Sequence, residues 1–466
     1  MSRIWTFAIV SVALFMVVLD NLVVTTALPS IRTDLGGGLT ALEWTVNAYT
    51  LTFAVLLLTG AALGDRFGRR RMFVGGLALF TLASAAAALA PSTGALIAAR
   101  ALQGAGAAIV TPLTLTLLAT AFPPEKRGLA IGAWSGISGL GVALGPLVGG
   151  AVVDGISWHW IFWLNVPIGL VLAPLAARRL AESHGPADRL DLPGLALGGL
   201  GLLGVVYGIV RASELGWTSS TILGSLALGV AALVAFVVWE LRAPAPMLPM
   251  RFFRSRAFAA SNGVSLALYF GVFGSIFLLA QFFQVTQGMS PLEAGLRTLP
   301  WTAMPMLVAP IAGVLSDRIG SRPLMATGLG LQAVAIAWLA SVSTPTVAYS
   351  ALVIPFVLAG TGMALVFAPT ANAVLGAVRP EEAGQASGAT NAIREVGGTL
   401  GVAVLASVFA AHGSYASPTA FTDGMTSAIW IGAAVLAVGA VVALLVPGRR
   451  AQAAPAQVAE PALAAS

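Results

Sequence analysis

The sequence has no cysteine, and only 9% of its 466 residues are charged. Without cysteine, the protein cannot form disulfide bonds, thiol-based active sites or cysteine-ligated metal sites. The low charge excludes a soluble globular protein, because about 25% of the residues of such proteins are charged. The three histidines are scattered and there is no phosphate-binding P-loop, which disfavours a membrane enzyme.

The chain is instead rich in apolar residues, which make up 58% of it. Runs of about 20 apolar residues, each long enough to cross a bilayer as a helix, recur along the whole sequence. Such uninterrupted runs exclude a β-barrel, whose strands alternate in polarity. We therefore predict an all-α integral membrane protein with fourteen membrane helices. These lie near residues 6–28, 44–63, 72–90, 95–118, 128–150, 160–177, 192–211, 220–241, 258–283, 293–315, 323–343, 348–372, 384–411 and 425–446.

The basic residues predict how the chain is oriented. If the N-terminus is inside, nearly all lysines and arginines fall in inside segments, whereas Arg32, Arg211 and Arg297 fall outside. Cytoplasmic loops of membrane proteins carry such an excess of basic residues. We therefore expect a multi-pass protein of the cytoplasmic membrane with both termini in the cytoplasm. The net charge of +6 reflects these loops and does not indicate binding to nucleic acid.

The chain also repeats itself. Residues 95–128 return as residues 351–384, and the motif GDRFGRR from Gly64 returns as SDRIGSR from Ser316. Two related halves in a very apolar chain are typical of transporters built by duplication. The predicted regions are an N-terminal six-helix half (1–185), two inserted helices with a cytoplasmic linker (186–254), a C-terminal six-helix half (255–448) and a disordered cytoplasmic tail (449–466).

The repeated charged motif forms a loop on the predicted cytoplasmic side. A carboxylate in this loop can accept hydrogen bonds from free N–H groups at a neighbouring helix N-terminus. Glycine permits a tight turn there, and the arginines can pair with carboxylates or lipid phosphates. An ordinary basic turn is the alternative, but the recurrence of the motif favours a specialised loop. Its candidate residues are Asp65, Arg66, Gly68, Arg69, Asp317 and Arg318.

Two residues of opposite charge are expected inside the membrane near its outer side. At 1.5 Å per residue, Arg100 lies ~8 Å inside the fourth predicted helix and Asp20 ~13 Å inside the first. A buried arginine is costly, so a pair of these two residues would offset the burial of each. A carboxylate in an apolar site is also a candidate for proton exchange. The alternatives are a purely structural ion pair and, for Arg100, extension to the outer headgroups.

The predicted helix 384–411 carries two further charges, Arg394 and Glu395, ~15 Å from its start. Neighbouring residues on a helix point ~100° apart, so the two cannot both face one central cavity. Glu395 shares a face with Asn391, and we predict it to be a second proton or cation site. A pair between Arg394 and Glu395 is the alternative. Weaker candidates for a substrate cavity are Asn391, Phe273, Phe277, Gln281 and Trp301.

The fifth predicted helix contains the glycine-rich sequence GVALGPLVGG. Gly141, Gly145 and Gly149 recur every four residues and form a face that another helix can approach closely. Pro146 bends the helix and frees a backbone carbonyl, and Gly150 ends the motif. Ordinary tight packing is the alternative, because glycines at this spacing are common in membrane helices.

With these motifs, the chain resembles the major facilitator superfamily, and its central helix pair resembles the fourteen-helix drug:proton antiporter branch. The segment WHWIFWLNVPIG at residues 158–169 adds to the similarity. The resemblance implies two halves that rock around a central site, a gating role for the loop at Asp65 and an antiport role for the fifth helix. The sequence departs from the family pattern near Asp20, where Leu22 and Thr25 replace a threonine and an asparagine.

The resemblance also implies a function. It implies a proton-coupled antiporter that exports amphipathic small molecules such as drugs or antibiotics, with a proton gradient as energy source and no cofactor, metal or catalytic residue. Proton coupling would involve Asp20, Arg100, Arg394 and Glu395. The expected partners are small-molecule substrates, protons and membrane lipids, not nucleic acid, and the expected state is a monomer. The alternative is an exporter dedicated to one self-made antibiotic or metabolite.

Overall fold

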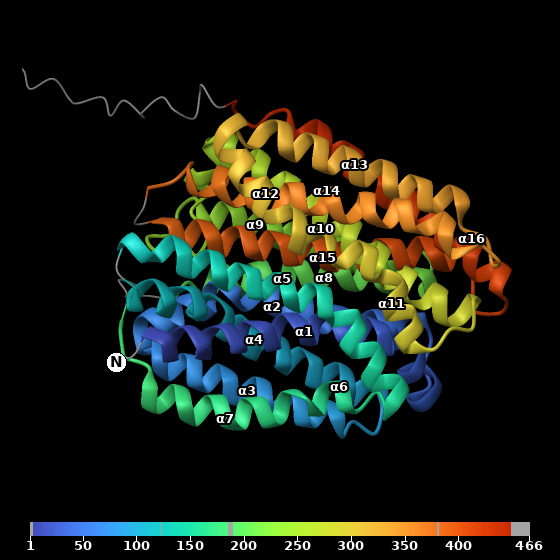
Figure 1. Ribbon diagram of the computed structural model, residues 1–466, viewed down its shortest axis with the longest axis horizontal. Coiled ribbons are helices and arrows are strands. Elements are labelled where there is room, and N and C mark those ends of the chain that lie inside the picture. Colours follow the sequence, from blue (N-terminus) through green and yellow to red (C-terminus); the bar gives the residue numbers. More distant parts are fainter. Residues whose placement is uncertain (1–2, 123, 185–189, 380–381, 449–466) are drawn as a thin grey trace, which may run out of the picture.

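In the computed structural model, the chain forms a bundle of helices that run side by side along its long axis (Figure 1). The structure describes residues 3–122, 124–184, 190–379 and 382–448, and no β-strand occurs in these ranges. The predicted tail, 449–466, lies outside them. We call the end of the bundle where α1 begins the N-terminal face and the end where α1 finishes the opposite face. The elements are α1 (Arg3–Leu35), α2 (Leu39–Phe67), α3 (Arg69–Ala88), α4 (Thr93–Ala121), α5 (Pro124–Gly155), α6 (Trp160–Trp163), α7 (Asn165–Arg179), α8 (Leu192–Leu215), α9 (Ser220–Glu240), η1 (Met250–Arg254), α10 (Arg256–Gln281), η2 (Phe282–Thr286), α11 (Pro291–Thr302), α12 (Met304–Ile319), α13 (Ser321–Val342), α14 (Tyr349–Leu375), α15 (Ala383–His412) and α16 (Pro418–Ala443).

Thirteen helical stretches of the described chain are long and apolar enough to cross a membrane, with α6–α7 and α11–α12 each counted as one stretch. The fourteenth is α5, which has 32 residues and therefore spans more than a bilayer core. The predicted all-α membrane protein with fourteen membrane helices is thus confirmed. Some boundaries differ: α1 extends to Leu35, beyond the predicted end near residue 28. α16 starts at Pro418 instead of near residue 425, and there the Ser417 hydroxyl accepts a hydrogen bond from the Ala420 N–H (3.2 Å).

Proline explains why two of the predicted helices are interrupted. Pro167 has no N–H to donate to the carbonyl of Trp163, where α6 ends. Pro305 in the same way leaves the carbonyl of Trp301 without its helical donor, next to the break between α11 and α12. Other prolines, such as Pro112 and Pro355, lie inside continuous helices, so proline alone does not show where a helix is interrupted.

Two helix pairs make the largest contacts between the first six and the last six membrane helices. α2 packs along α15, and α5 packs along α11. The α2–α15 contact includes a hydrogen bond between the hydroxyls of Thr50 and Thr399 (2.9 Å). The division of the chain into two halves stays a prediction, and these two contacts are the places where such halves would meet.

The two inserted helices cover the contact between α2 and α15. Leu51 of α2, Val206 and Val210 of α8, and Ala403 of α15 form one buried apolar cluster. α9 packs against α8 and leaves apolar side chains such as Leu228 74% exposed. An apolar exposed surface of this kind suits contact with lipid. α8 therefore covers the contact between α2 and α15, and α9 packs on α8.

Candidate functional site

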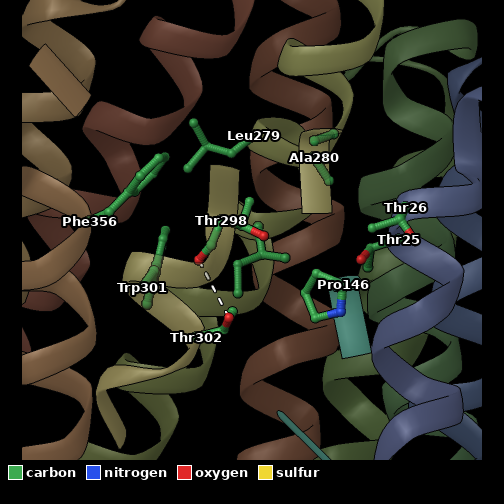
Figure 2. Close-up of a pocket in the computed structure, with 11 residues that line it drawn as sticks. Thr25, Thr26, Pro146, Leu279, Ala280, Thr298, Trp301, Thr302 and Phe356 are labelled. Atoms are coloured by element: carbon green, nitrogen blue, oxygen red, sulfur yellow. Dashed lines mark hydrogen bonds between the residues drawn. The ribbon is translucent and has the colours of Figure 1, made fainter. Parts of the chain in front are cut away.

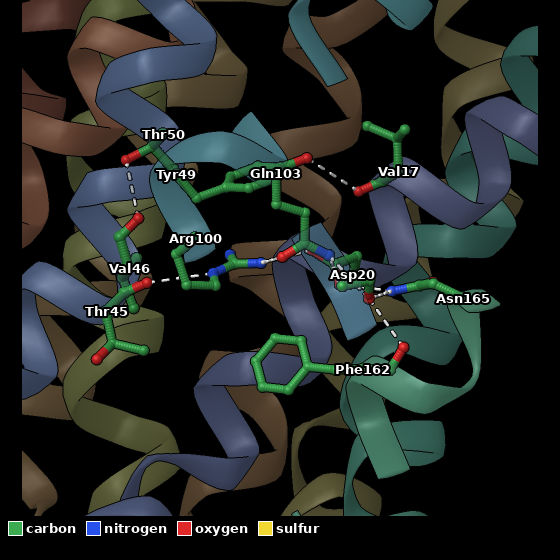
Figure 3. A network of polar contacts seen from close by, with 11 residues as sticks. Val17, Asp20, Thr45, Val46, Tyr49, Thr50, Arg100, Gln103, Phe162 and Asn165 are labelled. Carbon is green, nitrogen blue, oxygen red and sulfur yellow. Dashed lines mark hydrogen bonds and ion pairs between the residues drawn. The ribbon is translucent and has the colours of Figure 1, made fainter. Parts of the chain in front are cut away.

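Asp20 of α1 and Arg100 of α4 form an ion pair inside the bundle (Figure 3). Arg100 Nη1 lies 2.6 Å from Asp20 Oδ2, and neither side chain is exposed to solvent. The two charges therefore meet as the sequence predicts, and Arg100 does not extend to the headgroups. The role of the pair in proton coupling stays a prediction.

Two amide side chains from other helices bind the Asp20 carboxylate besides Arg100, and a serine orients both amides. The amides of Gln103 (α4) and Asn165 (α7) each donate to Asp20 Oδ1 at 2.7 Å. Both amides also donate to the hydroxyl of Ser84 (α3), at 3.2 Å and 3.0 Å. Ser84 in turn donates to the carbonyl of Phe162 (2.8 Å). The carboxylate is thus bound directly by α4 and α7, and α3 supports both amides through Ser84.

The Arg100 guanidinium is held on its other sides mainly by α2. Its Nε donates to the Thr45 carbonyl (3.2 Å), and its Nη1 donates to Gln103 Oε1 (2.8 Å). Its Cζ lies 4.2 Å from the centre of the Tyr49 ring and 5.8 Å from that of Phe162. A cation over an aromatic face is attracted by the negative charge of the ring face. Arg100 therefore has partners that remain if its carboxylate partner is neutralised.

This geometry determines what the cluster can do chemically. A buried ion pair survives only where good geometry and further hydrogen bonds compensate for the desolvation of both charges. Protonation of Asp20 would cancel its attraction to Arg100 and weaken the link between α1 and α4. One proton can therefore change contacts among several membrane helices without any covalent chemistry.

The sequence did not single out four members of this cluster. Gln103 stands three residues after Arg100, on the same helix face, and this spacing was a usable signal. Asn165 lies within the WHWIFWLNVPIG segment, whose resemblance to the family does not by itself distinguish this asparagine. Ser84 and Tyr49 are polar residues in apolar helices, and nothing else in the sequence distinguishes them.

The charges of α15 lie near the same region. Arg394 Nη1 donates to Asn391 Oδ1 (3.3 Å), and its Cζ lies 5.7 Å from the centre of the Tyr269 ring. Glu395 lies on α15, which packs along both α2 and α10. The role of Glu395 as a second proton site stays a prediction.

A small apolar cavity lies among α1, α5, α10, α11 and α14 (Figure 2). Its volume is about 10 Å³, which leaves room for about one water molecule. A substrate could therefore enter only if the helices moved apart. The lining residues are Thr25, Thr26, Pro146, Ile276, Leu279, Ala280, Ala294, Thr298, Trp301, Thr302 and Phe356.

The weaker cavity candidates are distributed over different places. Trp301 lines the cavity. Phe273 instead stacks on Tyr269 with ring centres 5.5 Å apart, and Phe277 is fully buried in the apolar core. Asn391 accepts the hydrogen bond from Arg394 described above. The structure thus places only Trp301 of these four at the cavity.

The loop between α2 and α3 has the predicted tight turn, in which Gly68 has a φ of 103°. Asp65 pairs with Arg69 of the same loop (2.8 Å), and no backbone N–H of the described residues donates to its carboxylate at a helix N-terminus, where we expected it. Glu182 occupies such a position instead, because its Oε1 accepts from the N–H of Arg70 in the first turn of α3 (2.9 Å). The remaining motif residue, Arg66, is exposed.

We expect Glu182→Ala to loosen this loop. The substitution removes the acceptor for the Arg70 N–H and the ion pairs to Arg70 and Arg71 (3.6 and 3.9 Å). Loss of a helix-capping group costs about 1 kcal/mol, so amide exchange in residues 68–73 should become roughly fivefold faster. Glu182→Gln keeps an acceptor oxygen and should show a smaller effect. Unchanged exchange in Glu182→Ala would contradict this assignment.

The second copy of the loop is described in part. Gly320 makes the turn equivalent to that at Gly68, with a φ of 90°. The side chain of Asp317 lies outside the described side chains, and Arg318 is exposed. A separate ion pair joins Arg251 of η1 to Glu382 (2.5 Å). This ion pair ties the linker after the inserted helices to the start of α15.

Gly141, Gly145 and Gly149 form a face of α5 that packs on α1. A Cβ atom added to Gly145 would lie 2.6 Å from the Cβ of Leu22, which is closer than real side chains approach. Leu22 is one of the two residues near Asp20 that depart from the family pattern, and it packs on α5. The predicted close approach of another helix is therefore observed.

Gly150 faces a different helix, α11. A Cβ atom at Gly150 would overlap the carbonyl oxygen of Pro291, and one at Gly295 would overlap the carbonyl oxygen of Pro146. The backbones of α5 and α11 are therefore in direct contact through two glycines. This contact lies toward the opposite face, where α5 ends and α11 begins.

Further contacts close the opposite face. Gln284 Nε2 donates to the Thr26 carbonyl (2.9 Å), and Arg32 Cζ lies 3.8 Å from the centre of the Tyr415 ring. The Tyr415 hydroxyl donates to Gln281 Oε1 (2.5 Å). Burial raises the pKa of Tyr415, so the hydroxyl keeps the proton that it donates. Gln281, a cavity candidate from the sequence, thus belongs to this closure.

The structure is thus a bundle of membrane helices with a fully buried ion pair. The sequence matches the profile of the Major Facilitator Superfamily over residues 10–402 and 262–465. The match covers most of the chain, and the protein belongs to this superfamily. It is therefore a transporter rather than an enzyme.

Several curated proteins are similar over most of their length. The tetracenomycin C resistance and export protein of Streptomyces glaucescens is 36% identical over 414 residues, which cover 88% of this chain and 77% of that protein. The multidrug resistance protein Stp of Mycobacterium tuberculosis is 36% identical over 413 residues, covering 88% and 76%. Both are described as resistance proteins.

Solved structures show the same fold. A bacterial homolog of the human lysosomal transporter Spinster, in an inward-facing and unoccupied conformation, matches with a TM-score of 0.67. The match covers 95% of this chain and 96% of that chain, at 16% sequence identity. At this identity, the similarity concerns the fold alone.

Proposed function

We propose that this protein is a proton-coupled antiporter that exports amphipathic small molecules across the cytoplasmic membrane. The observation that carries the proposal is the fully buried pair of Asp20 and Arg100, 2.6 Å apart. Charges inside a membrane bundle are costly, and by default they mark a proton or substrate pathway. The names of the similar resistance proteins support export as the direction of transport.

We propose that the N-terminal face is cytoplasmic. The arginine-rich loop at Arg69, Arg70 and Arg71 lies there, as basic loops do on the cytoplasmic side. The opposite face is then extracellular, and the contact of Arg32 with Tyr415 (3.8 Å) helps to close it. Opening of the extracellular side would be the step that releases an exported substrate.

Alternating access would then use the space between the two predicted halves. A proton that reaches Asp20 from outside neutralises the carboxylate and ends its attraction to Arg100. The change alters the relative stability of the two access states, as any ligand with unequal affinity for two states does. Glu395 would be a second site of the same kind. The membrane potential would add ~2.3 kcal/mol per charge per 100 mV.

The energy source and partners follow from this mechanism. The proton gradient would supply the energy, without a cofactor. Small-molecule substrates, protons and membrane lipids would be the partners. The contacts between α2 and α15 and between α5 and α11 bring both groups of helices together within one chain, which supports a monomer as the working unit.

The second candidate is a dedicated exporter of one self-made antibiotic or metabolite. One similar protein is named for a single compound, tetracenomycin C, and another for multidrug resistance, so each candidate has a precedent. Expression in an efflux-deficient host distinguishes them. Raised resistance to several unrelated drugs supports the proposal, and raised resistance to one compound supports the dedicated exporter.

Purified protein in proteoliposomes should move a substrate found in that panel against its concentration gradient when a pH gradient is imposed. Collapse of the gradient with a protonophore should stop net transport within the same experiment. We expect the rate to rise with the size of the pH gradient, because proton entry drives the cycle. Absence of flux for every panel compound, with correct folding shown, would contradict the proposal.

A further inference from the structure

The ring of Tyr49 lies against the proton site proposed above without taking part in its hydrogen bonds to the carboxylate. The ring is fully buried, and its centre lies 4.2 Å from the Arg100 Cζ. The hydroxyl makes only a long contact with the Val17 carbonyl (3.5 Å). The part of Tyr49 that contacts the charge cluster is therefore the aromatic face and not the phenol.

The surroundings of Arg100 show when this contact matters most. While Asp20 is ionised, the carboxylate at 2.6 Å balances the guanidinium charge. When Asp20 binds a proton, that balance is lost, and Arg100 stays charged because its guanidinium does not deprotonate in proteins. The Thr45 carbonyl, the Gln103 amide oxygen and the two rings then remain as partners. Of the two rings, that of Tyr49 is the closer.

The groups that act on Arg100 come from each helix packed around it. Asp20 of α1 is its ionised partner, Tyr49 of α2 lies over its face, and Glu395 lies on α15, which packs along α2. The residues from α3 and α7 that complete the cluster, Ser84 and Asn165, are neutral. Tyr49 therefore contacts the buried ion pair from α2, the helix that packs along α15 and its carboxylate Glu395.

We propose that Tyr49 is a positioning residue of the proton site, whose ring holds the Arg100 cation in place while Asp20 is protonated. The inference rests on the proposed function and deepens it. The ring attracts a lone cation more strongly than a neutral ion pair, because it also repels the carboxylate. It thus stabilises the protonated state of the site more than the ionised state, and it also links that state to α2, which contacts α15.

The sign of the expected pH effect follows from this difference. Removal of the ring makes protonation of Asp20 less favourable, so a more acidic medium is needed to drive the cycle. Tyr49→Leu should therefore shift the midpoint of the dependence of efflux on outside pH downward by about one unit. Tyr49→Phe keeps the ring face and should restore a midpoint close to that of the unchanged protein.

The experiment measures efflux of a panel substrate from proteoliposomes as a function of outside pH. Tyr207→Leu, on the inserted helix α8, is the matched control for loss of a tyrosine in the membrane, and thermal unfolding checks that each protein is folded. If Tyr49→Leu does not fold, fluorinated phenylalanines incorporated at position 49 keep the shape of the ring and weaken its attraction for cations stepwise. The pH midpoint should then fall with each added fluorine.

The outcomes separate this inference from the proposed function. A lower midpoint in Tyr49→Leu with restoration by Tyr49→Phe, or a stepwise fall with fluorination, supports the inference. An unchanged or higher midpoint in folded Tyr49→Leu, equal shifts in the Leu and Phe variants, or no trend with fluorination would overturn it. If the unchanged protein shows no pH-dependent efflux, the proposed function fails, and the inference fails with it.

Discussion

Asp20→Asn should abolish uphill efflux driven by a pH gradient while substrate binding is retained. The asparagine is close in shape to a protonated aspartate and can still accept hydrogen bonds from Gln103 and Asn165, whose amides lie 2.7 Å from Asp20 Oδ1. It can neither bind nor release a proton, so the site stays fixed in one state and the cycle stops. Arg100 also loses its ionised partner, which for a buried pair destabilises the fold by about 3–5 kcal/mol.

Efflux and binding are measured on the same preparation. We expect gradient-driven efflux to fall to the level of empty vesicles, while equilibrium binding of a panel substrate and its thermal stabilisation of the protein persist. Asp34→Asn is the matched control, because it makes the same change on α1 at a side chain that is 54% exposed. Its Oδ2 accepts from Trp158 Nε1 (2.8 Å), and the amide oxygen can do so as well. Retained uphill efflux in Asp20→Asn would refute proton coupling through this residue.

Gly150→Ala is expected to prevent the proposed extracellular side from closing. The new methyl group would overlap the Pro291 carbonyl oxygen and lie 2.7 Å from the Leu292 Cα, so α5 and α11 would have to separate. Overpacking of this kind costs about 1–3 kcal/mol, which changes the ratio of closed to open states by a factor of roughly 5 to 150. Transport should fall accordingly, since each cycle requires this closure.

The matched control is Gly155→Ala, five residues further along α5, because a Cβ atom there meets no atom within 4 Å. Because the chain has no cysteine, cysteines introduced at positions 33 and 416 in place of Thr33 and Ala416 can carry spin labels without background labelling. Their separation should increase in Gly150→Ala and stay unchanged in Gly155→Ala. Equal distance distributions in both variants would show that the α5–α11 contact does not control this closure.

The sequence predicted the membrane passages well because each depends on local properties. A run of about 20 apolar residues is enough to predict a membrane helix. The depths of Asp20 and Arg100 followed from helix rise alone. Their pairing was predictable because, for two opposite charges at similar depth in an apolar medium, mutual attraction offsets part of the cost of burying each charge.

The details of the site were less predictable. Asp65 was expected at a helix N-terminus, where the structure instead places Glu182, more than a hundred residues later in the chain. Gln281 is a sequence candidate for a central cavity, but its side chain accepts a hydrogen bond from the Tyr415 hydroxyl at the opposite face. In both cases a polar residue was recognised correctly as unusual, but its partner came from a distant segment that no local pattern connects to it.

The sequence by itself determined the class of fold, the membrane helices and the residues whose charge is unusual in a membrane. Only the tertiary structure decided that Gln103, Asn165, Ser84 and Tyr49 complete the site of Asp20 and Arg100. The physical reason is that lipid is as apolar as a protein core, so both faces of a membrane helix are apolar and periodicity does not show which face packs inward. Rotation and partner of each helix are set by close packing, and these emerge only when the helices are assembled.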